Sequence, residues 1–320
     1  MQNINFNSIE QFADILHLSE DGLANIINYK KYRTFKIKKR SGGYREINAP
    51  SFKLKVLQKW ILINILEKES ISKSAMAFIK SVNGIKKNAI IHKDNKYLLK
   101  MDLKDFYPSI TSYMVNKMYQ DFGYSEIEAN IFTKICTYKK KLPQGGITSP
   151  YISNLIFKTI DEKIEAHCKS QNICYSRYAD DLTFSCNDLK QLIAIKAFIT
   201  NYINHFTRFK INPLKTRIIY PSNKQTVTGI TINNGKISVN KRIKQEIRMS
   251  IYNLFKSGCY DTKYSQQRII GSISYVHSIE DEKDEYCYIN NCIKYISDLM
   301  VKFDAKSDYG LLNILQNMKK

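Results

Sequence analysis

Two adjacent carboxylates, Asp180 and Asp181, lie between two short runs of strand-forming residues near the middle of the chain. The runs span residues 173–178 and 182–184, and this pattern predicts a β-hairpin whose tight turn presents the acid pair. Adjacent like charges repel, so a protein that holds two carboxylates on a rigid turn often places a divalent cation beside them. The hairpin alone leaves a second interpretation open, in which the acid pair is only a solvated turn.

A second acidic segment places Asp102 and Asp105 where a largely apolar run, residues 97–103, comes to its end. The run predicts a central strand, and a strand end is stiff enough to aim a carboxylate. If this strand lies beside the hairpin, Asp102 meets Asp180 and Asp181. Three carboxylates can hold two Mg²⁺ ions about 3.5–4 Å apart, and such a pair serves in-line phosphoryl or nucleotidyl transfer.

The charge of the whole chain indicates a polyanionic partner. Among 320 residues, Lys and Arg number 50 against 29 Asp and Glu, which gives a net charge of +21. Nucleic acid is the commonest partner for an excess of this size on a folded chain. The 22 Tyr and 15 Phe residues supply faces on which bases can stack.

A membrane surface is the competing partner, but no basic amphipathic helix with a clean apolar face is evident. No apolar run approaches the roughly 18 residues of a spanning helix, and the first residues do not form a signal peptide. The seven cysteines are scattered without a CxxC motif, which is typical of reduced thiols in a cytoplasmic protein. We therefore expect a cytoplasmic protein with no membrane partner.

Turn signals and periodicity predict an α+β fold in which a sheet is layered with helices. The expected helices span about 9–17, 20–29, 50–67, 109–121, 125–137, 149–169 and 188–206. The expected strands span 32–39, 44–48, 97–103, the two arms of the acidic hairpin, 216–220 and 226–232, with Ser41 in the first turn. From Asn240 onward the pattern is helical and strongly basic, which predicts a separate terminal unit.

Three segments occur in the order and at the spacing of reverse transcriptase motifs A, B and C, and the chain resembles that family. The segments are Asp102 to Tyr107, Leu142 to Pro150 (LPQGGITSP) and Tyr178 to Asp181 (YADD), and Ile211 to Thr216 is similar to motif D. Two more segments narrow the resemblance to bacterial retron reverse transcriptases. Asn88 to His92 is similar to their NAxxH signature, and Val227-Thr228-Gly229 resembles their VTG signature.

The resemblance covers nearly everything from about residue 8 to the C-terminal helices. It implies a right-hand polymerase fold with fingers, a palm built of an antiparallel sheet plus helices, and a helical thumb. Residues 1–95 would form the N-terminal helices and fingers. Residues 96–232 would form the palm, with a fingers segment inserted at about 120–148, and residues 233–320 would form the basic thumb.

The resemblance also implies roles at the active site. Asp102, Asp180, Asp181 and the carbonyl of Leu103 would hold two Mg²⁺ ions. Tyr107 would exclude a ribose 2′-OH, although a tyrosine stacked in the core remains the alternative. The other residues expected to bind the dNTP are Arg45, Asp105, Phe106, Gln144 and Gly145, with Lys38, Lys39 and Arg40 as alternatives to Arg45.

Further roles are less specific. Lys215 would donate a proton to the departing pyrophosphate, or would only be a solvated turn lysine. His92 would contact nucleic acid or would fix the junction of fingers and palm. The remaining residues expected to bind nucleic acid are Val227, Thr228 and Gly229 at the primer grip and Lys241, Arg242, Lys244, Arg248 and Arg268 on the thumb.

The resemblance implies an RNA-directed DNA polymerase that binds its own structured noncoding RNA and uses dNTPs to copy part of it into single-stranded DNA. Priming from a 2′-OH of that RNA would give a branched product, and the system would act in defence against phage with a separate effector or toxin protein. One alternative is another bacterial reverse transcriptase, either group II intron-like or diversity-generating. A non-catalytic RNA-binding scaffold on the same fold is the second alternative.

Overall fold

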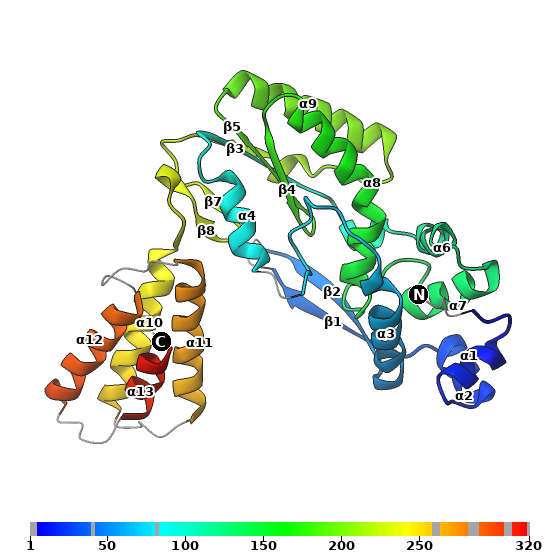
Figure 1. Ribbon diagram of the computed structural model, residues 1–320, viewed down its shortest axis with the longest axis horizontal. Coiled ribbons are helices and arrows are strands. Elements are labelled where there is room, and N and C mark those ends of the chain that lie inside the picture. Colours follow the sequence, from blue (N-terminus) through cyan, green and yellow to red (C-terminus); the bar gives the residue numbers. More distant parts are fainter. Residues whose placement is uncertain are drawn as a thin grey trace. The chain divides into compact units, whose positions relative to one another are not determined.

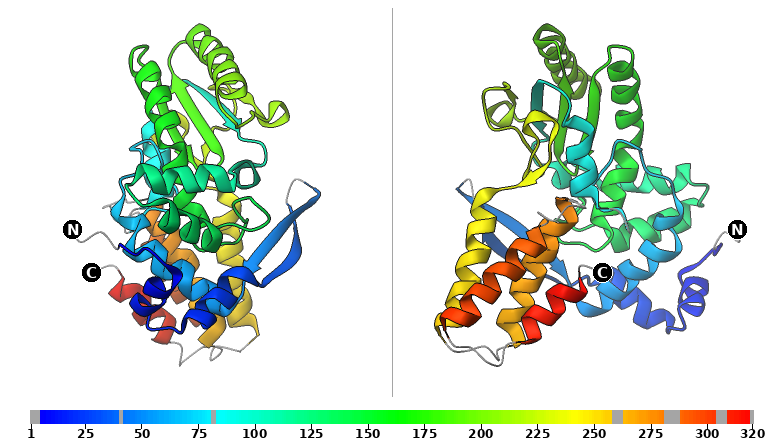
Figure 2. Two further views of the ribbon diagram at one scale, coloured as in Figure 1. Left: turned by 90° about the vertical axis from the view of Figure 1, so that its right-hand side faces the viewer. Right: turned by 60° about the vertical axis from the view of Figure 1, so that its left-hand side comes forward.

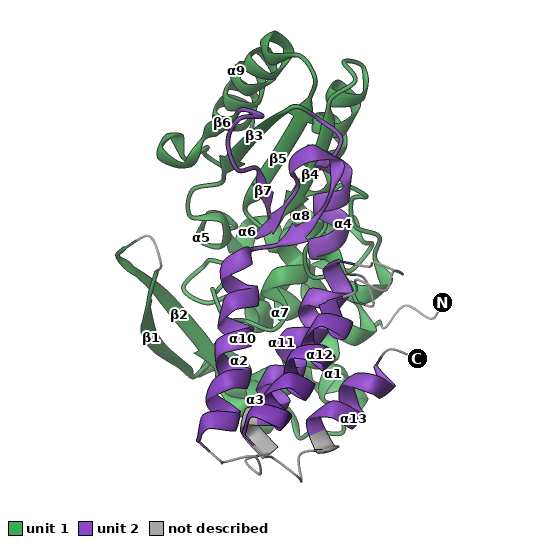
Figure 3. Cartoon of the chain, turned by 90° about the vertical axis from the view of Figure 1, so that its left-hand side faces the viewer, with its two compact units in different colours: residues 1–84, 96–219 green, residues 85–95, 220–320 purple. Residues whose placement is uncertain are grey.

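The computed structural model describes residues 5–39, 42–80, 83–257, 263–280, 288–303 and 309–318. Contacts within the chain divide it into two compact units (Figures 1 and 3). Unit 1 contains residues 1–84 and 96–219, and unit 2 contains residues 85–95 and 220–320. Arg40 and Ser41, in the predicted hairpin turn, lie outside the described residues.

A four-stranded sheet forms the centre of unit 1. Its strands are β3 (Tyr97–Asp102), β4 (Cys174–Tyr178), β5 (Asp181–Cys186) and β6 (Arg217–Ile219), in the order β4-β5-β3-β6 with every neighbouring pair antiparallel. Helix α8 (Ser149–Lys169) contacts β4, and α9 (Leu189–Phe206) contacts β3 and β5. Apolar residues of the strands, such as Leu99 and Phe184, are fully buried. The predicted antiparallel sheet with helices against it is confirmed.

Three further helices of unit 1 begin at serine caps. Ser8 and Ser19 cap α1 (Ile9–Ile15) and α2 (Glu20–Asn28), as predicted. Ser125 and Glu128 form a capping box at α7 (Glu126–Cys136), which satisfies two backbone N–H groups at once. The remaining helical segments are α3 (Phe52–Asn64), η1 (Leu66–Lys68), α5 (Phe106–Ser109), α6 (Ser112–Asp121) and η2 (Pro213–Lys215).

A two-stranded hairpin of β1 (Tyr32–Lys38) and β2 (Tyr44–Pro50) projects from the rest of unit 1 (Figure 2). The predicted hairpin is confirmed, but its second strand is longer than expected. Pro50 is paired with Tyr32 in the strand register, so α3 begins at Phe52 and not at Pro50. A proline is compatible with the end of an edge strand because it needs no ladder N–H there.

The described part of unit 2 contains α4 (Gly84–His92), whose first residue is counted with unit 1, together with a small three-stranded sheet and four further helices. The strands are β7 (Thr226–Val227), β8 (Ile230–Thr231) and β9 (Ser238–Val239), and η3 (Asn233–Gly235) lies between β8 and β9. The helices are α10 (Lys241–Lys256), α11 (Lys263–Ile279), α12 (Tyr288–Lys302) and α13 (Tyr309–Asn317). Ile247, Ile251 and Leu254 are buried on one face of α10, as its apolar spacing predicts.

One expectation for unit 2 was wrong, and one helix was missed. The single strand predicted over 226–232 is a hairpin, because Thr228 and Gly229 have φ values of 48° and 86° and turn the chain between β7 and β8. Positive φ at both central residues is the requirement of a tight two-residue hairpin turn. Helix α4 was not predicted, since its apolar spacing is weak. No described helix is both long enough and apolar enough to cross a membrane.

Candidate active site

The three predicted metal aspartates meet at one end of the central sheet. Asp102, the last residue of β3, lies opposite Asp181, the first residue of β5, in the antiparallel register. Tyr178 pairs with Asp181, so Ala179 and Asp180 form the turn between β4 and β5. The Leu103 N–H donates to the Asp180 carbonyl at 2.9 Å, which fixes the turn against the strand that carries Asp102.

The neighbouring acids disfavour one another's ionisation. Burial, followed by the neighbouring Asp102 carboxylate, raises the pKa of Asp180. Burial and the charge of Asp180 raise the pKa of Asp181 to about 6. Both shifts mean that ionising these carboxyls is unfavourable without additional positive charge nearby.

Lys215 and Asn212 stabilise part of the negative charge at this site by binding Asp102. The Lys215 Nζ lies 2.7 Å from Asp102 Oδ1, and the Asn212 Nδ2 donates to Asp102 Oδ2 at 3.3 Å. The hydrogen bond to Asp102 raises the pKa of Lys215. Asp102 is buried, whereas the Lys215 side chain is 56% exposed, so Lys215 is free to move away into solvent.

The donor set suits a hard divalent cation. Three carboxylates and the Leu103 carbonyl offer only oxygen, which Mg²⁺ and similar ions prefer, and the unfavourable ionisation of Asp180 and Asp181 is what such a cation would relieve. Among the described residues, no three acidic, histidine or cysteine side chains are gathered closely enough to form a finished metal site. The present arrangement, with Lys215 on Asp102, is therefore a site that must adjust when a cation binds.

An open cavity of about 850 Å³ lies beside these acids within unit 1. It brings together most of the residues that the sequence predicts at the active site. Those residues are Arg45, Asp102, Leu103, Asp105, Phe106, Tyr107, Gln144, Asp180 and Lys215. Asp181 and Gly145 are not among the lining residues.

The segment after β3 carries two aromatic side chains with different surroundings. The Phe106 ring is buried against Phe157 and Phe209, so it anchors the segment in the core. The Tyr107 ring is only partly buried and lines the cavity. Burial, with a smaller contribution from Asp180, raises the pKa of Tyr107 to about 12, which keeps its hydroxyl neutral.

Gln144 and Gly145 contact the hairpin of β1 and β2. The Asn48 N–H donates to the Gln144 carbonyl at 2.8 Å. Gly145 has a φ of 124°, and a Cβ there would lie 2.9 Å from the Asn48 carbonyl oxygen. Glycine is needed for this close backbone contact. Gly145 does not line the cavity itself, but its contact with Asn48 helps to position Gln144, which does.

Arg45 lies on β2 opposite Ile37 and lines the cavity. Lys38 and Lys39 line it too, so the choice among these cations as the partner of a triphosphate stays open. The alternative Arg40 lies outside the described residues.

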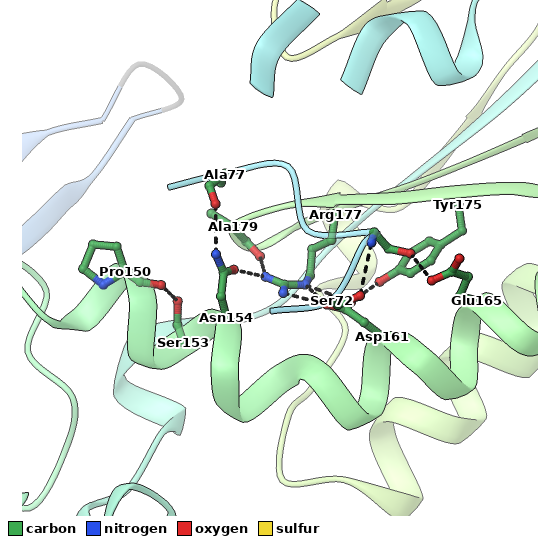
Figure 4. A network of polar contacts seen from close by, with 11 residues as sticks. Ser72, Ala77, Pro150, Ser153, Asn154, Asp161, Glu165, Tyr175, Arg177 and Ala179 are labelled. Atoms are coloured by element: carbon green, nitrogen blue, oxygen red, sulfur yellow. Dashed lines mark hydrogen bonds and ion pairs between the residues drawn. The ribbon is translucent and has the colours of Figure 1, made fainter. Parts of the chain in front are cut away.

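A fully buried ion pair fixes the acidic turn from behind (Figure 4). The guanidinium of Arg177 on β4 pairs with the Asp161 carboxylate of α8 at 2.7 Å, and neither side chain has exposed surface. The Arg177 Nη1 also donates to the Ala179 carbonyl at 3.0 Å and to Asn154 Oδ1 at 3.1 Å. Ala179 has a φ of 57°, a conformation that an alanine adopts only when its surroundings impose it.

In unit 2, His92 is fully buried on α4, which favours the structural role that the sequence left open. Val227 is buried, while the Thr228 hydroxyl donates to the Ile85 carbonyl at 3.2 Å, so the VTG turn is fixed to the start of α4. The basic residues Lys241, Arg242, Arg248 and Arg268 are exposed. Lys244 is partly buried and pairs with Glu280.

Sequence reasoning gave no role to three residues that the structure places at the site. Asn212 binds Asp102, Arg177 holds the acidic turn, and Phe78 lines the cavity. For Arg177 a signal existed, because a charged residue inside a strand of buried positions requires a buried partner. Nothing in the local pattern marks Phe78.

Comparison with known proteins assigns the family. A family model described as reverse transcriptase (RNA-dependent DNA polymerase) matches residues 37–232. The chain belongs to the reverse transcriptase family. Retron Ec86 reverse transcriptase from Escherichia coli is 33% identical over 275 residues, which cover 85% of this chain and 82% of that protein. Retron Ec83 reverse transcriptase from the same species is 35% identical over 283 residues, covering 83% and 89%.

These relatives identify the chain as an RNA-directed DNA polymerase of the retron type. A telomerase from Candida albicans, solved with a fragment of telomeric RNA, is similar in fold at a TM-score of 0.56 and 10% identity, covering 92% of this chain and 67% of that one. The predicted right-hand fold is thereby confirmed. Reverse transcriptases generally use divalent metal ions, which agrees with the oxygen donors gathered at the cavity.

The buried pair gives a first prediction. Asp161→Asn leaves the Arg177 charge buried without its counter-ion, and we expect a loss of about 3–5 kcal/mol in the free energy of unfolding by urea. The double variant Asp161→Leu with Arg177→Met, which buries no charge, should lose less stability than the single variant. Equal losses in both variants would show that the ion pair does not act as described.

The raised pKa of Asp181 gives a second prediction, for protein without divalent cations. Between about pH 4 and 6 the folded state retains a proton that the unfolded state releases, so stability falls as pH rises through this window. At pH 7 with EDTA, Asp181→Asn should be more stable than wild type by about 1 kcal/mol, a figure reduced for the solvent exposure of Asp181. Urea unfolding at pH 4.5 and 7 checks this, and Asp121→Asn on α6 is the exposed control. Identical pH slopes for wild type and Asp181→Asn would contradict it.

Proposed function

We propose that this reverse transcriptase binds a cognate structured noncoding RNA and copies part of it into single-stranded DNA at the cavity beside Asp102 and Asp180. The observation that carries the proposal is the strand register, which brings Asp102 to Asp181 at the mouth of a cavity with cationic walls. Two Mg²⁺ ions are the proposed cofactors, held by Asp102, Asp180, Asp181 and the Leu103 carbonyl. Ions held there would supply activation of the primer hydroxyl and charge stabilisation of the departing pyrophosphate.

Other residues at the cavity have proposed roles in binding the nucleotide, selecting its sugar and donating a proton. Arg45, assisted by Lys38 and Lys39, binds the triphosphate of the incoming dNTP, and Asp105 and Phe106 help to place it. Tyr107 lies under the sugar and excludes a 2′-OH, while Gln144, supported by Gly145, contacts the nucleotide. Lys215 leaves Asp102 and becomes a proton donor to pyrophosphate, for which its position at the cavity wall is suitable.

The proposed domains follow the right-hand division, with fingers in 1–95, palm in 96–232 with a fingers insertion at about 120–148, and thumb in 233–320. In the thumb, the exposed cations of α10 and α11 would follow a phosphate backbone and give salt-dependent affinity. The VTG turn, Val227 to Gly229, would support the primer. His92 would contribute by fixing α4 and the turn that contacts it.

The retron relationship supports three further proposals. The product is a branched RNA–DNA molecule primed from a 2′-OH of the RNA, the system acts in defence against phage, and a separate effector or toxin protein is a partner. A cytoplasmic location agrees with the five described cysteines, Cys136, Cys168, Cys174, Cys186 and Cys292, none of which forms a disulfide. The intron-like and diversity-generating alternatives differ from this proposal in the RNA that they use.

The catalytic part of the proposal is tested by removing the metal carboxylates. Asp180→Asn combined with Asp181→Asn should abolish Mg²⁺-dependent dNTP incorporation while leaving RNA affinity unchanged, because the acids belong to the proposed metal site of unit 1 and the cations proposed to bind RNA are on α10 and α11 of unit 2. Incorporation on the cognate template and filter binding of the RNA measure the two properties, with Asp121→Asn as the control. If wild type and double variant bind RNA equally and neither incorporates dNTPs, the protein is a non-catalytic scaffold.

The retron part is tested on protein purified from its native host. We expect one abundant structured RNA, joined through a 2′-linkage to single-stranded DNA, to copurify with the polymerase. Sequencing after debranching identifies both strands. Copurification of intron RNA, or of DNA without a branch, would favour the alternative reverse transcriptase classes.

A further inference from the structure

Phe78 lines the polymerase cavity in a conformation that phenylalanine rarely adopts. Its φ is 65°, a value that is uncommon and unfavourable for a bulky side chain. Two phenylalanines line the cavity in the described part of the chain; Phe106 is 3% exposed, whereas Phe78 is 41% exposed. The Phe78 ring is therefore an apolar surface presented to the cavity and is not part of the core.

Buried contacts impose this conformation on the segment. The Asn154 Nδ2 donates to the carbonyl of Ala77, the residue before Phe78, at 2.9 Å. The Met76 N–H donates to the Arg177 carbonyl at 2.8 Å. Asn154 in turn accepts a hydrogen bond from the Arg177 guanidinium, and Figure 4 shows Ala77, Asn154, Arg177 and Ala179 in one network. Phe78 follows Ala77 directly, so its backbone is attached to the network that fixes the turn of Asp180.

The two left-handed residues of this network, Phe78 and Ala179, thus have a common support. Ala179 precedes the catalytic carboxylates, and Phe78 faces the same cavity. Strain of this kind persists only where the surrounding structure over-determines it, and it is found preferentially at sites that handle a ligand. A network that holds both residues keeps the ring at a constant distance from the reacting groups.

We infer that Phe78 is a stacking surface for a nucleobase that enters the cavity. The inference rests on the proposed function of the cavity as the nucleotide site. Its cationic and acidic walls suit the phosphates and their ions, but a nucleobase also has apolar faces that need an aromatic or apolar partner. Stacking on an exposed aromatic ring serves every base equally, as a polymerase that copies all four bases requires.

The stacked base has two possible sources, the incoming dNTP and the template strand, and they are distinguished by different measurements. If the base belongs to the dNTP, loss of the ring raises KM for the dNTP. If it belongs to the template, loss of the ring raises Kd for the template–primer and leaves KM for the dNTP unchanged.

The experiment uses Phe78→Gly, Phe78→Leu and Phe78→Trp in the full chain, with Tyr113→Ala as a control because Tyr113 is 67% exposed on α6 and does not line the cavity. Glycine adopts positive φ without cost, so Phe78→Gly removes the ring while the unfolding midpoint stays equal or rises. We expect Phe78→Gly and Phe78→Leu to raise either KM or Kd by about 10-fold or more, and Phe78→Trp to stay near wild type.

Unchanged KM and Kd in Phe78→Gly, with an active wild type, would overturn the inference and leave the proposed function intact. A change in Phe78→Gly that Phe78→Trp shares in full would also overturn it, because the effect would then come from the backbone and not from an aromatic face. Failure of the wild type to incorporate dNTPs on a cognate template would overturn the proposed function, and the Phe78 inference with it.

Discussion

The buried ion pair of Arg177 and Asp161 is the constraint on which the active site depends. A charge pair without exposed surface is tolerable only when each partner is fully hydrogen-bonded, since any lost partner leaves an uncompensated charge in the core. Asp161 receives the Arg177 guanidinium and the Tyr175 hydroxyl. The remaining guanidinium donor binds Asn154 and Ala179. The geometry of the acidic turn thus depends on the need of the buried Arg177 guanidinium for hydrogen-bond acceptors, one of which is the Ala179 carbonyl.

The Arg177–Asp161 pair holds the turn in place although the carboxylates at the site repel one another. Three carboxylates converge where β3 and β5 meet, and their repulsion together with burial raises the pKa of Asp180 and Asp181. Lys215 relieves part of that repulsion through Asp102. The turn that carries Asp180 is held in place while Lys215 is exposed, so a cation that displaces Lys215 would meet carboxylates that are already gathered.

Local sequence was sufficient to predict the helices and strands that are marked by turn residues, alternation or capping residues. The hairpin at Asp180, the strand ending at Asp102 and the helices that begin after Ser8 and Ser19 were predicted because turn residues, alternation and caps are short-range features. The family resemblance also identified much of the cavity wall, with Tyr107 and Gln144 from the motifs and Arg45 as one of several candidate cations. The turn at Thr228-Gly229 was misread as strand because Thr228 is a β-forming residue that takes a positive φ only in the folded hairpin.

Long-range contacts account for what the sequence did not predict. Asn154 and Asp161 lie on α8, and nothing near Arg177 in the chain indicates that it reaches them. Phe78 lies in an irregular segment whose conformation is set by Asn154, 76 positions later in the chain. Asn212 reaches Asp102 from a turn that looks solvated in sequence. Each of these positions depends on how the sheet and α8 pack, which only the fold determines.

The most direct test of the account is the location of bound metal in the catalytic complex. A crystal structure with template–primer, a non-hydrolysable dNTP and Mn²⁺, read by anomalous scattering, should show Mn²⁺ bound by Asp102 and Asp180 with Lys215 displaced from Asp102. Anomalous peaks elsewhere, or a Lys215–Asp102 pair that persists in an active complex, would contradict the assignment of these acids as the metal-binding centre.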